Sequence, residues 1–179
     1  MAAEIRERGI GSVTLDDVGR RSGTGKSQLF HYFPEGKEQL LLAVARWEAD
    51  RVIEDQQPHL GRLTSWEAWD RWRDVVVERY RAQGVHCPLG VLLTEVGAHT
   101  PAAREVTREL LRQWQHHVQV GVERMRDEGR IAAGVDPERA AGALIAAIQG
   151  GVTILMATGS PAHLEAALNL CLDYLRTYR

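Results

Sequence analysis

The chain has 179 residues, 44% of them hydrophobic, and a formal net charge of -2 at pH 7. The length and hydrophobic content suit one small and one medium globular domain or a single helical body. The net charge excludes a protein that coats nucleic acid through a strongly basic surface. A local nucleic-acid reader is still allowed, because the stretch from Val18 to Pro34 carries Arg20, Arg21 and Lys26 and no acid.

A first short helix is expected to start at Thr14. The Thr14 hydroxyl can cap the helix, and Asp17 stands where a capping box has its acid, in the shorter form. Leu15 and Val18 then face inward. Gly23 allows the sharp left-handed or otherwise strained turn that follows Ser22.

A second short helix is expected from Thr24, as its cap, to about Phe33. Leu29, Phe30 and Phe33 lie at i, i+1 and i+4 and can pack as an apolar stripe on the first helix. The remaining side chains point outward and suit contacts with a DNA duplex; they are Lys26, Ser27, Gln28, His31 and Tyr32. The two helices together predict a helix-turn-helix.

The run Ser22–Ser27, S-G-T-G-K-S, also resembles the end of a phosphate-binding loop, G-x-x-x-x-G-K-[ST]. Counting back from Gly25, the place of the first glycine holds Arg20, and Gly19 comes one residue too early. The residues before the loop have helical spacing, whereas this motif requires a buried strand there. Nucleotide binding is therefore not expected.

The rest of the chain is expected to be helical almost throughout, so the predicted fold class is all-α. The next helix should have one inward face, formed by Leu40, Leu41, Val44 and Trp47. A short segment is expected at Pro88 to Glu95. The expected helices run from Lys37 to about Gln57, from a capping box of Thr64 and Glu67 through Tyr80, from Pro101 to Gly129, from Pro137 to Gly159, and from Pro161 onward.

The region from Ile10 to Leu41 resembles the DNA-binding domain of the TetR family of transcriptional repressors. The family's glycine, Thr-Leu helix start, Ser-Gly turn, recognition-helix lysine, aromatic helix end and Lys-Glu pair are matched in order. The matching residues are Gly9, Val13–Leu15, Val18, Ser22–Gly23, Lys26, Leu29–Phe33 and Lys37–Glu38. Two stretches, Phe33–Leu40 and Cys87–Gly90, are similar to the LmrA/YxaF-type branch.

The resemblance implies a helix-turn-helix DNA-binding domain at residues 1–45, with its first helix truncated, and a ligand-binding and dimerisation domain at 46–179. It implies a repressor that binds a palindromic operator in double-stranded DNA as a dimer and is released by a small molecule. The family usually has a tyrosine at Phe30 and a histidine at Tyr32, so operator choice should differ there. The residues expected at the DNA are Thr14, Thr24, Gly25, Lys26, Ser27, Gln28, Phe30, His31, Tyr32 and Lys37.

The helix after Asp136 is apolar nearly all round and must be covered on every side. A membrane span is the alternative, but the run is rich in alanine and glycine and contains Gln149, so no membrane is expected. The last helix offers a single stripe: Leu164, Leu168, Cys171, Leu172 and Leu175. We therefore expect a homodimer through the last two helices, with close approach at Ala140, Ala143, Ala147 and Gly151.

The middle of the chain is where the resemblance implies a pocket for a small, lipophilic effector. Aromatic walls with a few polar groups are the usual make-up of such a pocket. For each candidate, packing in the core is the competing interpretation, although Gln149 and Thr153 are polar in an apolar helix and need partners. The candidates are Trp66, Trp69, Tyr80, Leu92, Trp114, His117, Gln149 and Thr153.

No catalytic site, metal site or cofactor is expected. His116 and His117 point about 100° apart on a helix and cannot easily share a metal, and no nucleophile stands beside a base. Cys87 and Cys171 form no disulfide framework and, with no secretory signal in Met1–Arg8, favour the cytoplasm. A second hypothesis stays open: a dimeric small-molecule-binding or interaction protein with a non-functional helix-turn-helix.

Overall fold

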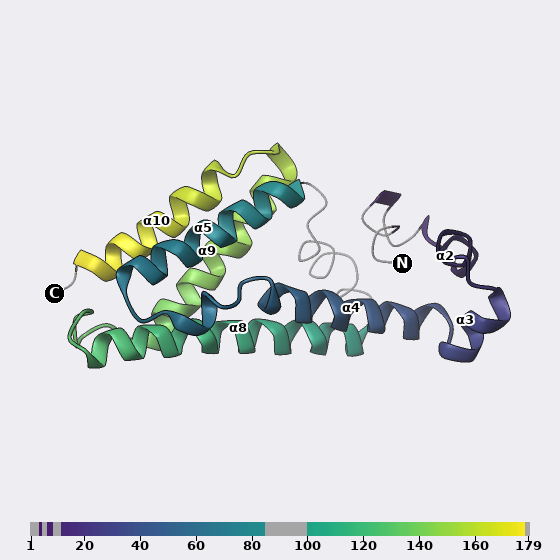
Figure 1. Ribbon diagram of the computed structural model, residues 1–179, viewed down its shortest axis with the longest axis horizontal. Helices are drawn as coiled ribbons and strands as arrows, with labels where there is room; N and C mark the ends of the chain where they lie inside the picture. Colours follow the sequence, from purple (N-terminus) through teal and green to yellow (C-terminus); the bar gives the residue numbers. More distant parts are fainter. Residues whose placement is uncertain (1–3, 5–6, 9–11, 85–99, 178–179) are drawn as a thin grey trace. The chain divides into compact units, whose positions relative to one another are not determined.

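The described part of the chain is helical, with helices joined by short turns (Figure 1). The computed structural model describes residues 4, 7–8, 12–84 and 100–177. No strand occurs among these residues, which confirms the all-α prediction. The helices are α2 (Leu15–Ser22), α3 (Lys26–Tyr32), α4 (Lys37–Glu54), the 3-10 helix η2 (Leu60–Arg62), α5 (Trp66–Gln83), α8 (Pro101–Asp127), α9 (Pro137–Thr158) and α10 (Ala162–Thr177).

The chain forms two compact units. The first is Met1–Val52 with His86–Glu109, and the second is Ile53–Val85 with Leu110–Arg179. The first unit contains α2, α3, most of α4 and the start of α8, and the second contains η2, α5, α9, α10 and the rest of α8. Two continuous helices, α4 and α8, therefore join the units covalently.

Helix α2 begins with the predicted capping box. The backbone N–H and the hydroxyl of Thr14 both donate to Oδ2 of Asp17, at 3.0 and 2.6 Å. The same hydroxyl accepts the backbone N–H of Asp17 at 3.2 Å. At the other end, Gly23 adopts the left-handed conformation with φ of 70°. Both predicted ends of this helix are confirmed.

The core of the first unit joins α2, α3, α4 and the start of α8. Val18 and Leu29 are buried in it, and Leu15 and Phe33 pack against it, as the sequence predicts. Its buried members are Val13, Val18, Leu29, Leu40, Leu41, Val44, Ala45 and Ala103.

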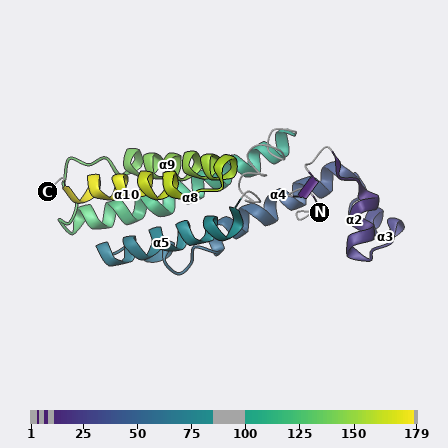
Figure 2. The same ribbon diagram turned by 90° about the horizontal axis from the view of Figure 1, so that it is seen from above.

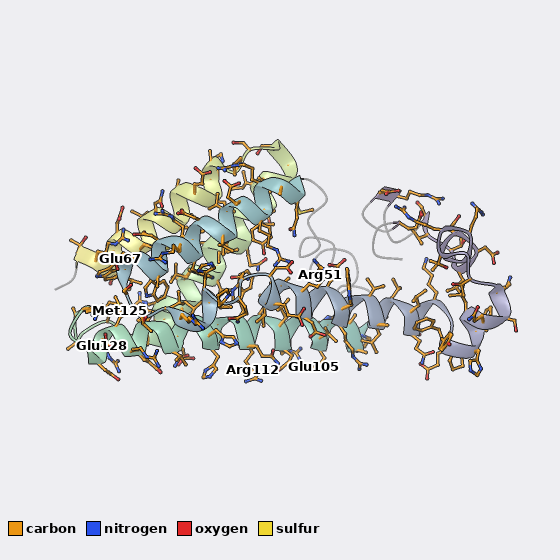
Figure 3. The ribbon with its side chains drawn as sticks, viewed as in Figure 1. Arg51, Glu67, Glu105, Arg112, Met125 and Glu128 are labelled. Carbon is orange, nitrogen blue, oxygen red and sulfur yellow. The ribbon has the colours of Figure 1, made fainter. Side chains whose placement is uncertain are left out.

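Two aromatic residues predicted to face this core are exposed instead. Phe30 is 42% and Trp47 is 48% exposed. Phe30 follows the buried Leu29 directly, so it is rotated about 100° away from the buried side of α3. Arg51, which Figure 3 labels on α4, partly covers the Trp47 ring, because its guanidinium carbon lies 5.0 Å from the ring centroid. The prediction that these two residues pack inward is wrong.

The predicted limits of the later helices are correct to within a few residues. Helix α4 ends at Glu54, slightly before the expected Gln57. Helix α5 is capped by Ser65, whose hydroxyl accepts the N–H of Ala68 at 3.3 Å, so the prediction of a Thr64 cap is wrong by one residue. Helix α9 starts after Asp136, which accepts the N–H groups of the next turn, and ends at a left-handed Gly159.

Helices α9 and α10 lie side by side in the second unit (Figures 1 and 2). Gly151 of α9 permits this approach, because a Cβ at that position would lie 2.5 Å from Cα of Leu164. Gly151 therefore serves a contact within the chain and is unavailable to the dimer contact expected of it. The four leucines of the α10 stripe are buried, while Cys171 is only half-buried.

Candidate nucleic-acid interface and ligand site

The turn between α2 and α3 is set by backbone groups. Gly25 is the N-cap of α3 and no side chain accepts there, so the prediction that Thr24 caps this helix is wrong. The reason is that the N–H of Thr24 completes the end of α2, donating to the carbonyl of Gly19 at 3.0 Å and to the Ser22 hydroxyl at 3.3 Å. The chain needs one more residue before α3 can begin.

Gly19 lets α2 and α3 come together closely. A Cβ at Gly19 would lie 2.9 Å from the carbonyl oxygen of Thr24 and 3.4 Å from Cδ1 of Leu29. Because the nearer atom belongs to the backbone, it cannot rotate out of the way. Sequence reasoning used Gly19 only to exclude a phosphate loop and missed this role.

Helix α3 presents a polar and aromatic face to solvent. Leu29 is its single buried residue, while Phe30 and Tyr32 are 42% and 63% exposed. The rings of His31 and Tyr32 meet edge to face with centroids 5.4 Å apart. The exposed residues, which are all predicted DNA contacts, are Gly25, Lys26, Ser27, Gln28, Phe30, His31 and Tyr32. Seven predicted site residues are thus gathered in one short segment.

The basic residues of this region differ in how firmly they are paired with acidic residues of the chain. Arg21 donates to Glu4 at 2.9 Å and to Glu7 at 3.0 and 3.1 Å, and these contacts, to Glu7 first, raise its pKa. It therefore joins α2 to the residues before it. Lys26 is 69% exposed, with Nζ 3.4 Å from Asp16. Its ion pair is solvated and easily exchanged for another anion.

Two further predicted DNA contacts lie at helix starts. The Thr14 hydroxyl is held by Asp17, and this hydroxyl and the Thr14 backbone N–H lower the pKa of the Asp17 carboxyl to about 2. Lys37 is the first residue of α4 and is half-buried. Thr24 is also half-buried, in the turn.

The predicted ligand residues occupy three kinds of environment. Trp69, Tyr80 and Trp114 are fully buried. Trp66 is half-buried, with the Arg176 guanidinium carbon 5.1 Å from its ring centroid. His117 lines a cavity of about 60 Å³ with Leu60, Leu63 and Gly121.

Helix α9 carries the two polar candidates. Thr153 is exposed, and its hydroxyl donates to the carbonyl oxygen of Gln149 at 2.9 Å. Gln149 is half-buried, but its Nε2 is buried and, within the described residues, has no hydrogen-bond partner. The indole Nε1 of Trp69 is in the same state. Unpaired buried donors are rare in folded proteins. Leu92 lies outside the described residues.

A buried amide that the sequence did not single out organises the tryptophans. Oε1 of Gln56 accepts from Nε1 of Trp72 at 2.8 Å and from Nε1 of Trp114 at 3.1 Å. Trp69 meets Trp72 edge to face, with centroids 5.7 Å apart. The predicted candidates Trp69 and Trp114 are therefore connected through Trp72 and Gln56.

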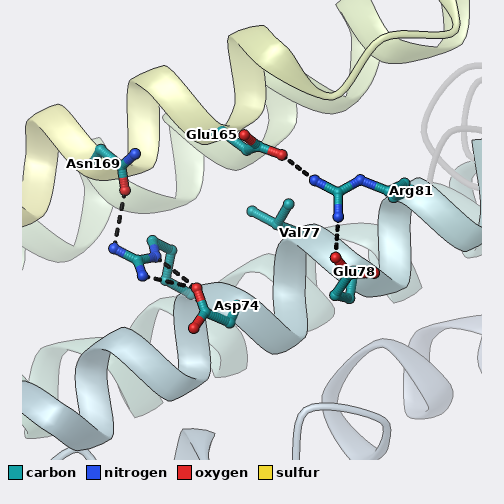
Figure 4. Close-up of a pocket in the computed structure, with 7 residues that line it drawn as sticks. Asp74, Val77, Glu78, Arg81, Glu165 and Asn169 are labelled. Carbon is teal, nitrogen blue, oxygen red and sulfur yellow. Dashed lines mark hydrogen bonds and ion pairs between the residues drawn. The ribbon is translucent and has the colours of Figure 1, made fainter.

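A second hollow, of about 280 Å³, lies between α5 and α10 (Figure 4). Arg73 donates to Asn169 at 3.1 Å and to Asp74, while Arg81 pairs with Glu78 and Glu165. Each cation here already has an acidic partner. The hollow is therefore lined by polar contacts that connect α5 and α10, and both of its arginines are already neutralised, so it should not attract an anion.

The outer side of α9 and α10 carries an apolar groove of about 490 Å³. Ala140 and Ala143 of α9 line it together with Leu170 and Tyr174 of α10. Leu170 is 73% and Tyr174 is 52% exposed, and both are large hydrophobic side chains. Such a concentration of exposed apolar surface is typical of a protein contact.

Helix α9 is long and apolar enough, by length and composition alone, to cross a membrane, with a mean hydropathy of 1.8. Its inward side packs in the second unit, where Leu144, Ile148 and Val152 are buried. In the part of the chain that the structure describes, no group of three His, Cys, Asp or Glu residues could hold a metal ion.

Comparisons with known proteins give one consistent result. Residues 2–44 match the family described as bacterial regulatory proteins, tetR family, and residues 62–171 match the tetracyclin repressor-like C-terminal domain. Over 99 residues, the chain is 27% identical to an uncharacterized HTH-type transcriptional regulator of Mycobacterium tuberculosis. That match covers 52% of this chain and 47% of the relative, so the chain spans about half the length of the curated relatives it matches.

Solved structures share the fold over nearly the whole chain. A TetR transcriptional regulator from Chloroflexus aurantiacus J-10-FL is 25% identical, with a TM-score of 0.84 over 99% of this chain and 90% of that one. FadR from Bacillus subtilis, solved in complex with stearoyl-CoA, is 18% identical, with a TM-score of 0.75 over 98% and 94% of the two chains.

Proposed function

Because the chain belongs to the tetR family of bacterial regulatory proteins, we propose that it is a ligand-responsive repressor that binds a palindromic operator as a homodimer and is released by a small molecule. The observation that carries this proposal is the outward face of α3. Its apolar side is anchored by Leu29, and its exposed side chains are the donors, acceptors and aromatic rings that read a major groove.

Several of the residues proposed to contact DNA have side chains that suit a particular partner. Gln28 suits an adenine edge, which an amide can bind through two hydrogen bonds. Lys26 suits a phosphate or a guanine, since its present ion pair is exposed. Lys37, at the start of α4, suits a backbone phosphate. Thr14 stays in the proposed set, although its hydroxyl donates to Asp17 in this structure. Phe30 has no hydroxyl and can offer only an apolar contact.

A second copy of the chain is the proposed cover of the groove on α9 and α10. The exposure of Leu170 and Tyr174 supports this pairing, and the small side chains of Ala140 and Ala143 let helices come close. Two recognition helices in such a dimer would read half-sites about 34 to 36 Å apart, or one further turn. The proposed dimer therefore covers the apolar groove and calls for a palindromic operator.

The proposed effector is a small lipophilic molecule bound within the second unit. The buried rings of Trp69, Tyr80 and Trp114 support an apolar site, and the unpaired donors Trp69 Nε1 and Gln149 Nε2 support a ligand with hydrogen-bond acceptors. The FadR complex with stearoyl-CoA has the same fold. His117, Trp66, Leu92 and Thr153 stay in the proposed set.

We further propose a cytoplasmic location, which the free thiol of Cys171 supports. In a bundle of paired α9 and α10 helices, the apolar surface of α9 is covered by protein, so no membrane is needed.

We also propose a narrower kinship with the LmrA/YxaF-type branch of the family. The resemblance of Phe33–Leu40 and Cys87–Gly90 to that branch supports it.

A gel shift with the promoter region next to the protein's own gene tests the proposal. We expect a complex that competes with specific but not with shuffled DNA and that weakens as salt rises, because phosphate contacts release counterions. Absence of a sequence-specific complex would favour the second hypothesis, a dimeric binding or interaction protein whose helix-turn-helix is not used. Screening lipophilic compounds for release of the complex then identifies the effector class.

A further inference from the structure

Asp16 of α2 lies beside the first residue of α3. Its Oδ1 is 3.4 Å from Nζ of Lys26, and both side chains are largely exposed, at 64% and 69%. The stretch from Val18 to Pro34 contains no acid, so the carboxylate at the basic start of α3 comes from the other helix. Both helices belong to the first unit. The fold therefore places a negative charge next to a residue proposed to contact DNA.

The neighbouring Asp17 has a different role. Its side chain is only 12% exposed, because it forms the capping box with Thr14 and pairs with Arg8 at 3.3 Å and Arg20 at 3.4 Å. Asp16 is one residue earlier on α2 and is therefore rotated about 100° from Asp17. Its charge is directed to α3, so Asp16 is the carboxylate of α2 that a duplex bound by α3 would approach.

The position of this carboxylate limits what Lys26 can bind. If Lys26 exchanged Asp16 for a backbone phosphate, that phosphate would lie close to the carboxylate, and two like charges repel. The major-groove edge of a guanine offers the acceptors N7 and O6 and carries no net charge. An ammonium group has three N–H donors, so it can donate to a guanine while it keeps its carboxylate partner. The carboxylate therefore penalises a phosphate contact more than a guanine contact.

We propose that Asp16 is a positioning residue for DNA recognition, which directs Lys26 away from phosphate and toward a guanine of the operator. The inference rests on the proposed function, because it requires that α3 reads a major groove. It deepens that function by choosing between the two partners that suit Lys26. Specificity arises from a penalty on the wrong contact as well as from a better right one, and Asp16 supplies such a penalty.

The experiment measures binding of the full chain by fluorescence anisotropy at several salt concentrations. The duplexes are the operator, located by footprinting, its single-base variants and a shuffled sequence. Asp16→Asn keeps the shape of the side chain and removes its charge. We expect this variant to bind shuffled DNA about two- to fivefold more tightly, with a salt slope steeper by about one, because Lys26 then contacts a phosphate. Its discrimination at one G·C pair should fall by a similar factor.

Asp50→Asn and Lys26→Ala are the controls. Asp50 is exposed about 20 Å along α4 from the first residue of that helix, so its substitution changes the net charge equally at another place. It should leave the discrimination at every base pair unchanged. Lys26→Ala should lose the same G·C discrimination. In that background, Asp16→Asn should change neither the discrimination nor the salt slope, because the residue through which it acts is absent.

A steeper salt slope on shuffled DNA together with weaker discrimination at one G·C pair in Asp16→Asn, absent in Asp50→Asn and dependent on Lys26, supports the inference. Discrimination in Asp16→Asn that equals that of the natural protein at every base pair overturns the inference and leaves the repressor proposal intact. The same holds if the operator and shuffled DNA gain affinity by one common factor. A natural protein without any sequence-specific complex overturns the repressor proposal and this inference with it.

Discussion

The side-chain oxygen of Gln56 accepts a hydrogen bond from the indole nitrogen of Trp72 at 2.8 Å, and both residues are fully buried. Trp114 donates to the same oxygen at 3.1 Å. One amide therefore satisfies two indoles that come from different helices. This contact places a hydrogen-bonded amide in the interior of the second unit.

Gln56→Leu should destabilise the protein strongly. It leaves two buried indole donors without an acceptor, at about 1 to 3 kcal/mol each. We expect a fall of roughly 3 kcal/mol in the free energy of unfolding, measured by urea denaturation. Gln57→Leu, at the exposed neighbouring position, should cost far less. Equal losses in the two variants would show that the indoles have found other partners.

Thr14→Ala should remove the main cause of the low pKa of Asp17. With a pKa of about 2 against an ordinary 3.8, the Asp17 carboxylate stabilises the fold above pH 3.8, and this stabilisation is lost as pH falls toward 2. In Thr14→Ala, a carboxyl NMR titration should give a pKa nearer 3.8. Thermal unfolding at pH 7 should start about 2 to 4 °C lower, from loss of the cap.

Thr24→Ala is the control for that measurement, because no hydroxyl cap is present at α3. It should leave the pKa of Asp17 and the unfolding temperature nearly unchanged. If Thr24→Ala lowered the unfolding temperature as much as Thr14→Ala, the assignment of Gly25 as the cap of α3 would be wrong.

Gly19→Ala should separate α2 from α3. The added methyl group would lie 2.9 Å from the carbonyl oxygen of Thr24, so the turn must shift. We expect a loss of about 1 to 3 kcal/mol in stability and a large loss of operator affinity in a gel shift. Gly142→Ala is a matched change within a helix, but its methyl group would meet only Gln115 at ordinary distance. An unchanged operator affinity in Gly19→Ala would contradict the close approach.

Leu170→Glu should yield monomers in sedimentation velocity. It would place a charge on the most exposed large hydrophobic side chain of the groove on α9 and α10, and burying that charge in a dimer is costly. Val120→Glu, at another exposed apolar residue, should leave the dimer intact. A dimeric Leu170→Glu variant would mean that the subunits pair through a different surface.

Local signals in the sequence were enough to predict the helices. The Thr14 and Asp17 capping box and the left-handed Gly23, Gly129 and Gly159 all act within a few residues, so their consequences can be read directly. The caps at Thr24 and Thr64 were misplaced by one residue, because the choice between adjacent candidates depends on how the preceding turn closes.

Long-range relationships could not be predicted in this way. Gln56 meets Trp72 and Trp114 across 16 and 58 residues, and nothing near Gln56 marks it as buried. The exposure of Phe30 and Trp47 likewise depends on which neighbouring side chains occupy the core of the first unit. For the candidate site, the predicted residues of α3 share one exposed segment, whereas the predicted ligand residues differ widely in burial.

The most direct test of the proposed function is the binding of Gln28→Ala to single-base variants of the operator, measured by fluorescence anisotropy. We predict that the natural protein discriminates at one base pair by about 1 to 3 kcal/mol and that Gln28→Ala loses this discrimination there alone. Lys37→Ala should weaken all sequences alike and reduce the salt slope by about one. Discrimination that persists at every position in Gln28→Ala would contradict base reading by this residue of α3.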